Sequence, residues 1–320
     1  MRAACGFPVR RTTARRRRRT APAVAAALVA LVCAAPVAVA GGSGDDTGRT
    51  VTLAGGRGVH LECRGTGSPT VVLVSGTGGA ADEWTHVAVH GALEPSAKAV
   101  LPEVARYTRV CAYDRPGTTR ADDTPTTSTP VTQPTSARDG ADDLRAVLAA
   151  AGERGPYVLV GASWGAMITE LLARTDAPAV AGLVTVDGAS PHLRDTMTPE
   201  QWSDWMRLIG TRPKGKGPEV PDYPAAIREI RAAPASPKPA VPAVVLTSDH
   251  PWDLKVGRTG STWPAWLAAQ ERLAAELHAR HVTRTDSGHG IAVEQPALVS
   301  DAIREVVDAA RAAGRQAPTR

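Results

Sequence analysis

The sequence has few aromatic residues: its 320 positions include four Tyr and a single Phe, Phe7. Seven Trp and the aliphatic side chains must therefore provide the large apolar groups of any core. There is no internal repeat, which argues against solenoid and propeller architectures. Cys and His residues show no spacing typical of a structural metal site, so we predict no bound metal.

Acidic residues are absent from positions 1–40, which contain eight Arg and no Lys. Subtracting these eight from the 37 Lys+Arg leaves residues 41–320 with 29 basic and 32 acidic residues, a net charge of −3. The formal charge of +5 on the whole chain therefore comes from the first 40 residues. Binding of nucleic acid by the Arg15–Arg19 run is an alternative only if that segment is retained, so we expect no nucleic-acid partner.

The same 40 residues have the three parts of an export signal. The Arg-rich start is followed by an apolar stretch, Ala21–Ala40, that closes on an Ala-x-Ala site at Ala38–Ala40. This stretch is long enough to span a membrane, but Pro22, Pro36 and the Ala-x-Ala end favour cleavage. We predict a signal peptide at residues 1–40, cleavage after Ala40, and a secreted protein with no stable membrane anchor.

Two of the four cysteines, Cys5 and Cys33, lie in the predicted signal peptide, which leaves Cys63 and Cys111. Outside the cytosol an even pair of cysteines is expected to form a disulfide, and two buried free thiols are the alternative. Residues 41–320 suit one domain that is long enough to bury a sizeable core.

Segments typical of strands and of helices alternate along the chain. Residues 80–106 are interpreted as helical or loop-like, and residues 118–135 as a Thr/Pro-rich loop. The alternation predicts an α/β fold with a mostly parallel sheet. Strands are expected at 50–54, 59–63, 70–75, 109–113, 157–160, 180–186, 241–247 and 281–284, and helices at 141–151, 166–173, 263–279 and 296–313.

The segment Gly161–Gly165 has the form G-x-S-x-G and lies between a buried strand and a helix. A nucleophile on a sharp strand-to-helix turn has a strained backbone, so small residues are needed two positions before and after it. The N-terminus of the following helix also presents free N–H groups to a developing negative charge. We therefore predict that Ser163 is a nucleophile and that Gly161 and Gly165 are the glycines of its turn.

With this motif in place, the chain resembles the secreted α/β-hydrolase fold family over about residues 50–313. The resemblance implies a mostly parallel eight-stranded sheet flanked by helices, with a small lid insertion at about residues 190–240. It places the family's oxyanion-binding turn at Val71–Gly79, where Ser75-Gly76 replaces the usual His-Gly. It also implies that the backbone N–H groups of Thr77 and Trp164 bind the oxyanion.

The resemblance also concerns the end of the sheet and the cysteines. Ser287-Gly288-His289-Gly290 follows the last expected strand, where the family has its catalytic histidine, so His289 is the expected general base. The family's sheet order sets the second strand beside the fourth. These strands contain Cys63 and Cys111, and the resemblance therefore implies a disulfide across them.

The acid that would orient His289 has two main candidates. The chain order Ser, Asp, His allows Asp187, at the end of one strand, or Asp249, after the next. Most family members use the later strand, but the family spacing there falls on Pro251, whereas Asp187 fits the earlier strand directly; Asp253 is a remote third candidate. We expect the other carboxylate to accept backbone hydrogen bonds in its turn.

The resemblance implies two-step acyl transfer on a small-molecule ester or amide, with no cofactor. Hydrolysis of carboxylic esters is the first hypothesis. A serine aminopeptidase of the proline-iminopeptidase type is the second, although the sequence does not identify acidic residues that would hold the substrate's amine. A non-catalytic secreted binding protein on the same scaffold is the third. Epoxide and haloalkane hydrolysis are disfavoured because their nucleophile is Asp.

Most of the tryptophans lie near the predicted rim or lid, which predicts an aromatic, apolar acyl pocket. For two of them, which lie on one face of an expected helix, we favour a place in the core. The two assigned to the core are Trp263 and Trp266; the other five Trp residues are Trp84, Trp164, Trp202, Trp205 and Trp252.

Overall fold

The computed structural model describes residues 46–210, 215–234, 240–252 and 260–316. The predicted signal peptide, residues 1–40, lies outside these described residues, and so does Asp253. All described residues belong to one compact unit that extends from residue 42 to the C-terminus. In the described ranges, no helix combines the length and the apolar character needed to cross a membrane.

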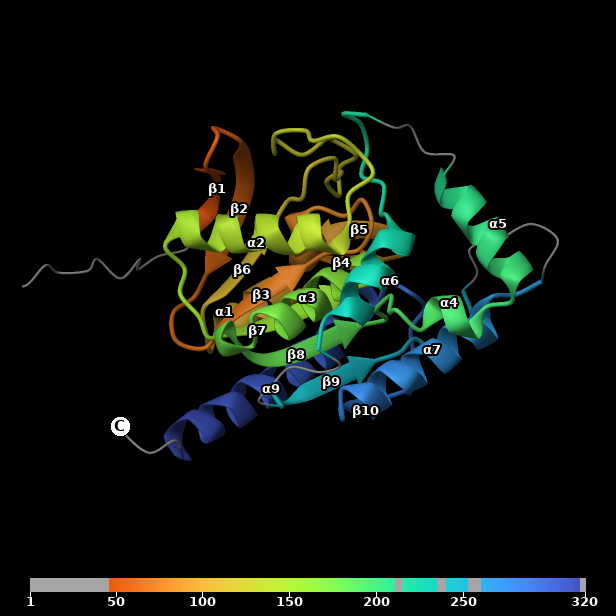
Figure 1. The fold of residues 1–320 in the computed structure, drawn as a ribbon. Coiled ribbons are helices and arrows are strands. Elements are labelled where there is room, and N and C mark those ends of the chain that lie inside the picture. Colours follow the sequence, from red (N-terminus) through yellow and green to blue (C-terminus); the bar gives the residue numbers. More distant parts are fainter. Residues whose placement is uncertain (1–45, 211–214, 235–239, 253–259, 317–320) are drawn as a thin grey trace, which may run out of the picture. The chain divides into compact units, whose positions relative to one another are not determined.

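Eight strands of the described chain form one sheet (Figure 1). Its order is β1-β2-β6-β3-β7-β8-β9-β10; β2 pairs antiparallel with β1 and β6, and all other neighbours are parallel. The predicted mostly parallel eight-stranded sheet is thus confirmed. The strands are β1 (Asp46–Thr52), β2 (Gly58–Arg64), β3 (Thr70–Val74), β6 (Val110–Tyr113), β7 (Tyr157–Ala162), β8 (Val180–Val186), β9 (Ala243–Leu246) and β10 (Arg280–Val282).

The central strands are apolar on both faces, as expected for a sheet covered by helices on each side. In β3, Val72 and Val74 belong to one core cluster, and Val71 and Leu73 belong to the other. Each cluster includes side chains from the helices on its face of the sheet (Figure 1). The first contains α2 (Ala137–Ala151), α3 (Trp164–Thr175) and α7 (Trp263–Glu276), and the second contains α1 (Val100–Ala105) and α9 (Pro296–Gln316).

The interpretation of residues 80–106 as helical or loop-like is wrong in its middle part. A short 3-10 helix, η1 (Ala81–Thr85), is followed by an antiparallel hairpin of β4 (His86–Val89) and β5 (Ala92–Pro95). His90 and Gly91, with φ of 49° and 83°, form its two-residue loop. Each strand has only four residues, too few to establish an alternating pattern in the sequence.

The segment between β8 and β9 contains three helices in its described part, α4 (Leu193–Thr196), α5 (Pro199–Gly210) and α6 (Tyr223–Ala232). It corresponds to the segment expected as a lid. The remaining short helices are η2 (Ala177–Ala179), before β8, and α8 (Ile291–Glu294), before α9.

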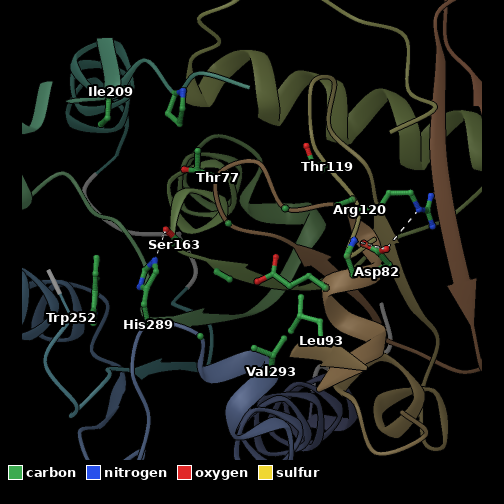
Figure 2. Close-up of a pocket in the computed structure, with 18 of the residues that line it drawn as sticks. Thr77, Asp82, Leu93, Thr119, Arg120, Ser163, Ile209, Trp252, His289 and Val293 are labelled. Carbon is green, nitrogen blue, oxygen red and sulfur yellow. Dashed lines mark hydrogen bonds and ion pairs between the residues drawn. The ribbon is translucent and has the colours of Figure 1, made fainter. Parts of the chain in front are cut away.

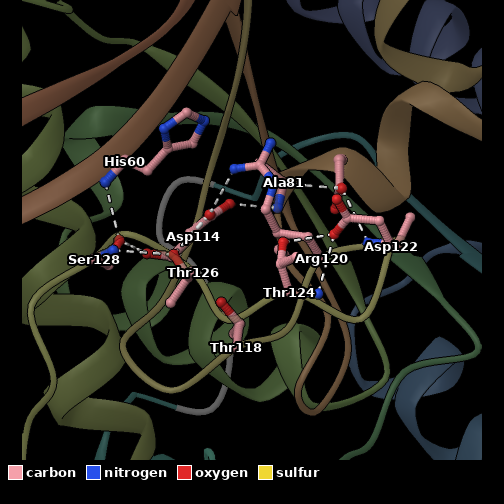
Figure 3. A network of polar contacts seen from close by, with 12 residues as sticks. His60, Ala81, Asp114, Thr118, Arg120, Asp122, Thr124, Thr126 and Ser128 are labelled. Atoms are coloured by element: carbon pink, nitrogen blue, oxygen red, sulfur yellow. Dashed lines mark hydrogen bonds and ion pairs between the residues drawn. The ribbon is translucent and has the colours of Figure 1, made fainter.

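The Thr/Pro-rich segment 118–135 is ordered around Asp114 rather than by regular secondary structure (Figure 3). The Asp114 carboxylate accepts hydrogen bonds from the Ala81 N–H and the Thr126 hydroxyl, both at 2.7 Å. The Ser128 hydroxyl donates to the Asp114 carbonyl at 2.8 Å. One buried carboxylate thus holds this loop against η1, and the loop carries Thr119 and Arg120 to the pocket described below.

The disulfide implied by the strand order is present. Cys63 on β2 is directly opposite Cys111 on β6, their Cα atoms are 4.1 Å apart, and their sulfur atoms are bonded. With Glu153 these cysteines are the one grouping of potential metal ligands in the part of the chain that the structure describes. Because the disulfide uses both sulfur atoms, this grouping offers no thiolate ligand.

We expect reduction of this disulfide to lower the free energy of unfolding by about 4 kcal/mol, because the bond closes a loop of 48 residues in the unfolded chain. Urea unfolding with and without dithiothreitol measures the difference. A double variant, Cys63→Ser with Cys111→Ser, is the control and should not respond to dithiothreitol. Equal unfolding curves for oxidised and reduced wild type would contradict the prediction.

Candidate active site

Ser163 lies on the turn between β7 and α3 with φ of 47° and ψ of −118°, a strained conformation for a residue with a side chain. Hydrogen bonds hold this backbone: the Ser163 N–H donates to the Val186 carbonyl at 3.1 Å, and its own carbonyl accepts from Ala189 at 2.9 Å. A Cβ at Gly161 would lie 2.5 Å from the Ala166 Cα, and one at Gly165 would lie 2.2 Å from the Val74 oxygen. Both glycines of the motif are therefore sterically required.

Three of the predicted site residues are brought into contact from distant parts of the chain. The Ser163 Oγ is 3.0 Å from His289 Nε2 (Figure 2). His289 Nδ1 is 2.6 Å from Asp187 Oδ2. Ser163 directly precedes α3, Asp187 follows β8, and His289 lies in the loop between β10 and α8. The Asp187 carboxylate is fully buried, whereas the His289 side chain is 35% exposed. The line of contacts therefore runs from a buried acid to an accessible hydroxyl.

The second oxygen of Asp187 is also occupied. Asp187 Oδ1 accepts hydrogen bonds from the Ser248 N–H at 3.1 Å and from the Trp266 Nε1–H at 3.0 Å. These donors fix the carboxylate, so that Oδ2 faces His289.

Asp249, the alternative acid, does not contact His289 and is exposed. It accepts hydrogen bonds from the N–H groups of Thr285 at 3.2 Å and Ser287 at 3.0 Å. Burial alone would raise the pKa of Asp249, but backbone N–H groups of Ser287 and Asp286 and the Thr285 hydroxyl hold it below its ordinary value. Asp249 thus accepts backbone hydrogen bonds from the loop that carries His289.

A pocket of about 680 Å³ opens over Ser163 and His289. Its two sides differ: in Figure 2, Ile209 and Trp252 lie on one side, Thr119, Arg120 and Asp82 lie on the other, and Ser163 is between them. We call the side with Ile209 and Trp252 the apolar side, and the side with Thr119, Arg120 and Asp82, next to Glu83 in the chain, the polar side. The lining also includes Trp205, Leu208, Tyr223 and Trp266.

Among the acidic residues of the polar side, Asp82 lies 3.7 Å from Arg120 and accepts a hydrogen bond from the Ala121 N–H. Burial raises the pKa of Glu83 above its ordinary value, although the Arg115 charge, the Gly76 N–H and the Ser75 hydroxyl act in the opposite direction. The polar side is therefore built around one paired acid, Asp82, and one half-buried acid, Glu83, whose pKa is raised.

The turn expected to bind an oxyanion lies beside Ser163. A Cβ at Gly76 would be 3.2 Å from the Ser163 Cβ, and both Gly76 and Thr77 line the pocket. Trp164 is the first residue of α3, where backbone N–H groups have no acceptor within the helix. Both expected donor residues are thus close to the Ser163 hydroxyl.

A buried ion pair supports this turn and was not foreseen from the sequence. Arg115 Nε is 2.6 Å from Glu219 Oε1, and Arg115 also donates to the carbonyls of Ser75 at 2.9 Å and Gly76 at 2.6 Å. Glu219 Oε2 accepts from the Gly78 N–H at 2.7 Å. Arg115 and Glu219 are 104 residues apart, and no local sequence pattern indicates that they pair.

We expect Glu219→Gln to lower the free energy of unfolding by about 3 to 5 kcal/mol, because Arg115 would remain buried without its counter-charge. Any catalytic activity of the site should fall as well, since the turn that carries Thr77 loses its support. Urea unfolding and kcat/KM measure the two effects. The matched control is Glu305→Gln, which breaks a half-exposed pair with Arg280 and should cost at most about 1 kcal/mol. Equal losses in the two variants would contradict the prediction.

A second buried ionic cluster joins α3 to α7 and α4. Arg174 Nη2 is 2.5 Å from Glu170 Oε1 and 2.8 Å from Glu276 Oε1, and Glu276 Oε2 is 2.7 Å from His192 Nε2. Burial raises the pKa of Glu170 from 4.5 to about 7, although the Arg174 charge lowers it.

The folded protein therefore binds the Glu170 proton more tightly than the unfolded chain does. The stability that the protonated Glu170 contributes is fully present below pH 4.5 and is lost as the pH rises to about 7. Glu170→Gln cannot lose this contribution. Between pH 4.5 and about 7, its free energy of unfolding should therefore rise by about 3 kcal/mol relative to that of wild type, as measured by urea unfolding at several pH values. The exposed Glu271→Gln on α7 is the control, and a gain of the same size there would contradict the assignment to Glu170.

The tryptophans divide differently from the sequence-based expectation. Trp84, a residue of η1, is fully buried in the core and does not line the pocket. Trp266, expected only in the core, is buried but also lines the pocket and donates to Asp187. Trp263 is half-buried and packs edge-on against Trp252, with ring centroids 6.4 Å apart. A helical spacing identifies a buried face but not which polar group lies beneath it.

Comparison with known proteins concerns the fold as a whole. A model described as alpha/beta hydrolase family matches residues 71–302. A curated relative, an uncharacterized protein of Schizosaccharomyces pombe, is 33% identical over 147 residues, which are 41% of this chain and 26% of that protein. The chain thus matches only about a quarter of the length of that relative.

Two solved structures extend the comparison to most of the chain. A thermophilic esterase from Thermogutta terrifontis has a TM-score of 0.52 and 21% identity and covers 82% of this chain and 98% of its own. An enzyme that degrades N-acyl homoserine lactones has a TM-score of 0.53 and 18% identity and covers 81% of this chain and 100% of its own. At these identities the likeness concerns the fold.

Proposed function

Because the chain belongs to the alpha/beta hydrolase family, we propose that it is a serine hydrolase of carboxylic esters. In this proposal Ser163 is the nucleophile, His289 the general base and Asp187 the acid. The observation that carries it is the unbroken line of contacts from Asp187 Oδ2 through His289 to Ser163 Oγ, at 2.6 and 3.0 Å. A non-catalytic binding protein would have no need of this line or of the strained backbone at Ser163.

The proposed reaction has two steps. The Ser163 oxygen attacks the ester carbonyl while its proton passes to His289 Nε2, and the carbonyl electron pair moves onto oxygen. The N–H groups of Thr77 and Trp164 bind this oxyanion, and its collapse expels the alcohol, which takes the proton from His289. Water then attacks the acyl-enzyme in the same way and releases the acid. Asp187 stabilises the imidazolium in both steps.

The pocket supports a small ester with an apolar acyl or alcohol part. A volume of about 680 Å³ lies in the range of sites for small molecules, and its aromatic side favours an apolar group. The polar side favours a group that can donate hydrogen bonds to Asp82 or Glu83.

Glu83 also favours a second candidate, a serine aminopeptidase. A carboxyl that lines the pocket near Ser163 could bind the α-amino group of a substrate, and it supplies an acidic residue that the sequence alone did not identify. We rank this second because Glu83 is half-buried and already interacts with the Ser75 hydroxyl and the Gly76 N–H.

Labelling with a fluorophosphonate and a substrate panel test both candidates. The proposal expects one label per molecule and turnover of p-nitrophenyl acetate, butyrate and octanoate. Higher kcat/KM on alanine or proline p-nitroanilide than on every ester would favour the aminopeptidase. No label and no turnover of any substrate would overturn the serine hydrolase.

We further propose that the protein is secreted after cleavage of residues 1–40. The charge distribution of the leader supports this, and so does the Cys63–Cys111 disulfide, because such bonds persist in oxidising compartments. N-terminal sequencing of the exported protein should begin at Gly41. An intact Arg15–Arg19 run in the exported protein would contradict the proposal.

A further inference from the structure

Two indole rings enclose the imidazole of His289. The Trp252 and His289 ring centroids are 4.0 Å apart and their planes differ by 32°, so Trp252 covers one face of the imidazole (Figure 2). Trp266 meets the same ring edge-on, with centroids 5.6 Å apart and planes at 84°. The proposed mechanism assigns no role to either ring.

Hydrogen bonds tie both indoles to Asp187, one through Ser248 and one directly. Trp252 Nε1 donates to the Ser248 hydroxyl at 3.0 Å, and the Ser248 N–H donates to Asp187. Trp266 Nε1 donates to Asp187 directly, and the two indoles pack edge-on with centroids 4.8 Å apart. The rings are therefore fixed relative to the acid and the base, which a loose apolar wall would not require.

We propose that Trp252 is a positioning residue that stacks on His289 and stabilises the imidazolium formed when His289 takes the Ser163 proton. This inference rests on the proposed function. The face of an indole is negatively polarised and attracts a cation placed over it, and Trp is the strongest side chain for this interaction. The attraction grows as the imidazole gains charge, so it favours the transition state over the ground state.

A residue that only lines the pocket behaves differently. It would contact the substrate equally before and during the reaction, and its loss would raise KM and leave kcat unchanged. Loss of imidazolium stabilisation instead lowers kcat. A less stable imidazolium also moves the acid limb of the kcat/KM profile to lower pH.

The charged groups around His289 are the same in every variant of the test. Asp187 bonds to it from the end of β8, Glu83 on η1 is electrostatically coupled to it, and Glu294 on α8 accepts from the Ser287 hydroxyl and the Gly288 N–H in the loop that carries it. If replacing Trp252 moves the acid limb of the kcat/KM pH profile, the move is therefore due to the loss of the indole.

The experiment compares wild type with Trp252→Leu, Trp252→Phe and Trp263→Leu on p-nitrophenyl acetate, with melting temperatures measured for all four. Trp252→Leu should lower kcat about tenfold and change KM less than about twofold. It should also move the acid limb of the kcat/KM profile about one pH unit lower, because the loss in kcat and the move of the acid limb measure the same free energy. Trp252→Phe retains an aromatic face, so its kcat should fall only about threefold and its acid limb should move about half a pH unit lower. Trp263→Leu removes an indole that touches Trp252 and does not line the pocket, and it should match wild type.

A rise in KM with kcat unchanged, or equal losses for Leu and Phe with an unmoved acid limb, would overturn the inference and leave the serine hydrolase standing. If Trp252→Leu does not fold, the Phe variant decides by the same criteria. A wild-type protein that takes no fluorophosphonate label and hydrolyses no ester would overturn the proposed function, and with it the inference.

Discussion

Replacement of Ser163 by Ala is expected to lower kcat on p-nitrophenyl esters by about 10⁴-fold or more and to abolish fluorophosphonate labelling. The variant has no oxygen to attack the carbonyl, so no acyl-enzyme forms. Only binding and the proposed oxyanion donors would remain to accelerate hydrolysis. The fold should be unaffected, since the Ser163 backbone is held by its own N–H and carbonyl groups rather than by its hydroxyl.

Ser300→Ala is the matched control for this result. Ser300 is a nearly buried serine on α9 whose hydroxyl has no hydrogen-bond partner within the described ranges. It should retain wild-type labelling and turnover. Labelling that persists in Ser163→Ala would place the nucleophile elsewhere and refute the mechanism.

Replacement of Asp187 by Asn is expected to lower kcat by about 10⁴-fold. An amide at this position cannot stabilise an imidazolium, and its NH₂ group can force the imidazole into the tautomer that cannot accept the Ser163 proton. Because Asp187 Oδ1 also accepts from Ser248 and Trp266, circular dichroism and melting temperature should accompany the kinetics.

Asp249→Asn is the matched comparison, because both carboxylates follow neighbouring strands of the sheet. It should keep kcat within about tenfold of wild type and lower stability by about 1 to 2 kcal/mol, since backbone N–H groups of Thr285 and Ser287 lose a charged acceptor. The reverse order of the two kinetic effects would assign the acid to Asp249.

The local features of the site could be predicted from the sequence. Gly161, Ser163 and Gly165 are close in the chain, and the constraint on them is steric and short-range, so a motif and its strand–helix context were sufficient. The strand order, taken from the family resemblance, correctly paired Cys63 with Cys111. The β4–β5 hairpin was missed because its strands are too short to show a period.

The features missed in the site join residues that are far apart in sequence. Arg115 meets Glu219 across 104 residues, and Trp266 meets Asp187 across 79. A charged residue in a loop and a tryptophan on a helix have many roles open to them, and each role depends on the partner that folding supplies. Trp266 was therefore expected in the core, where it is, but not as a donor to the acid.

By itself, the sequence determined the α/β class, the nucleophile candidate on its strained turn, and the origin of the +5 charge in the first 40 residues, because composition and short-range sterics are properties of contiguous residues. Only the tertiary structure decided which carboxylate lies against His289. Asp187 and Asp249 have the same chemistry and similar positions in the chain order. Their difference is one of direction: the end of β8 turns Asp187 inward to His289 and Trp266, while Asp249 turns outward to the loop after β10.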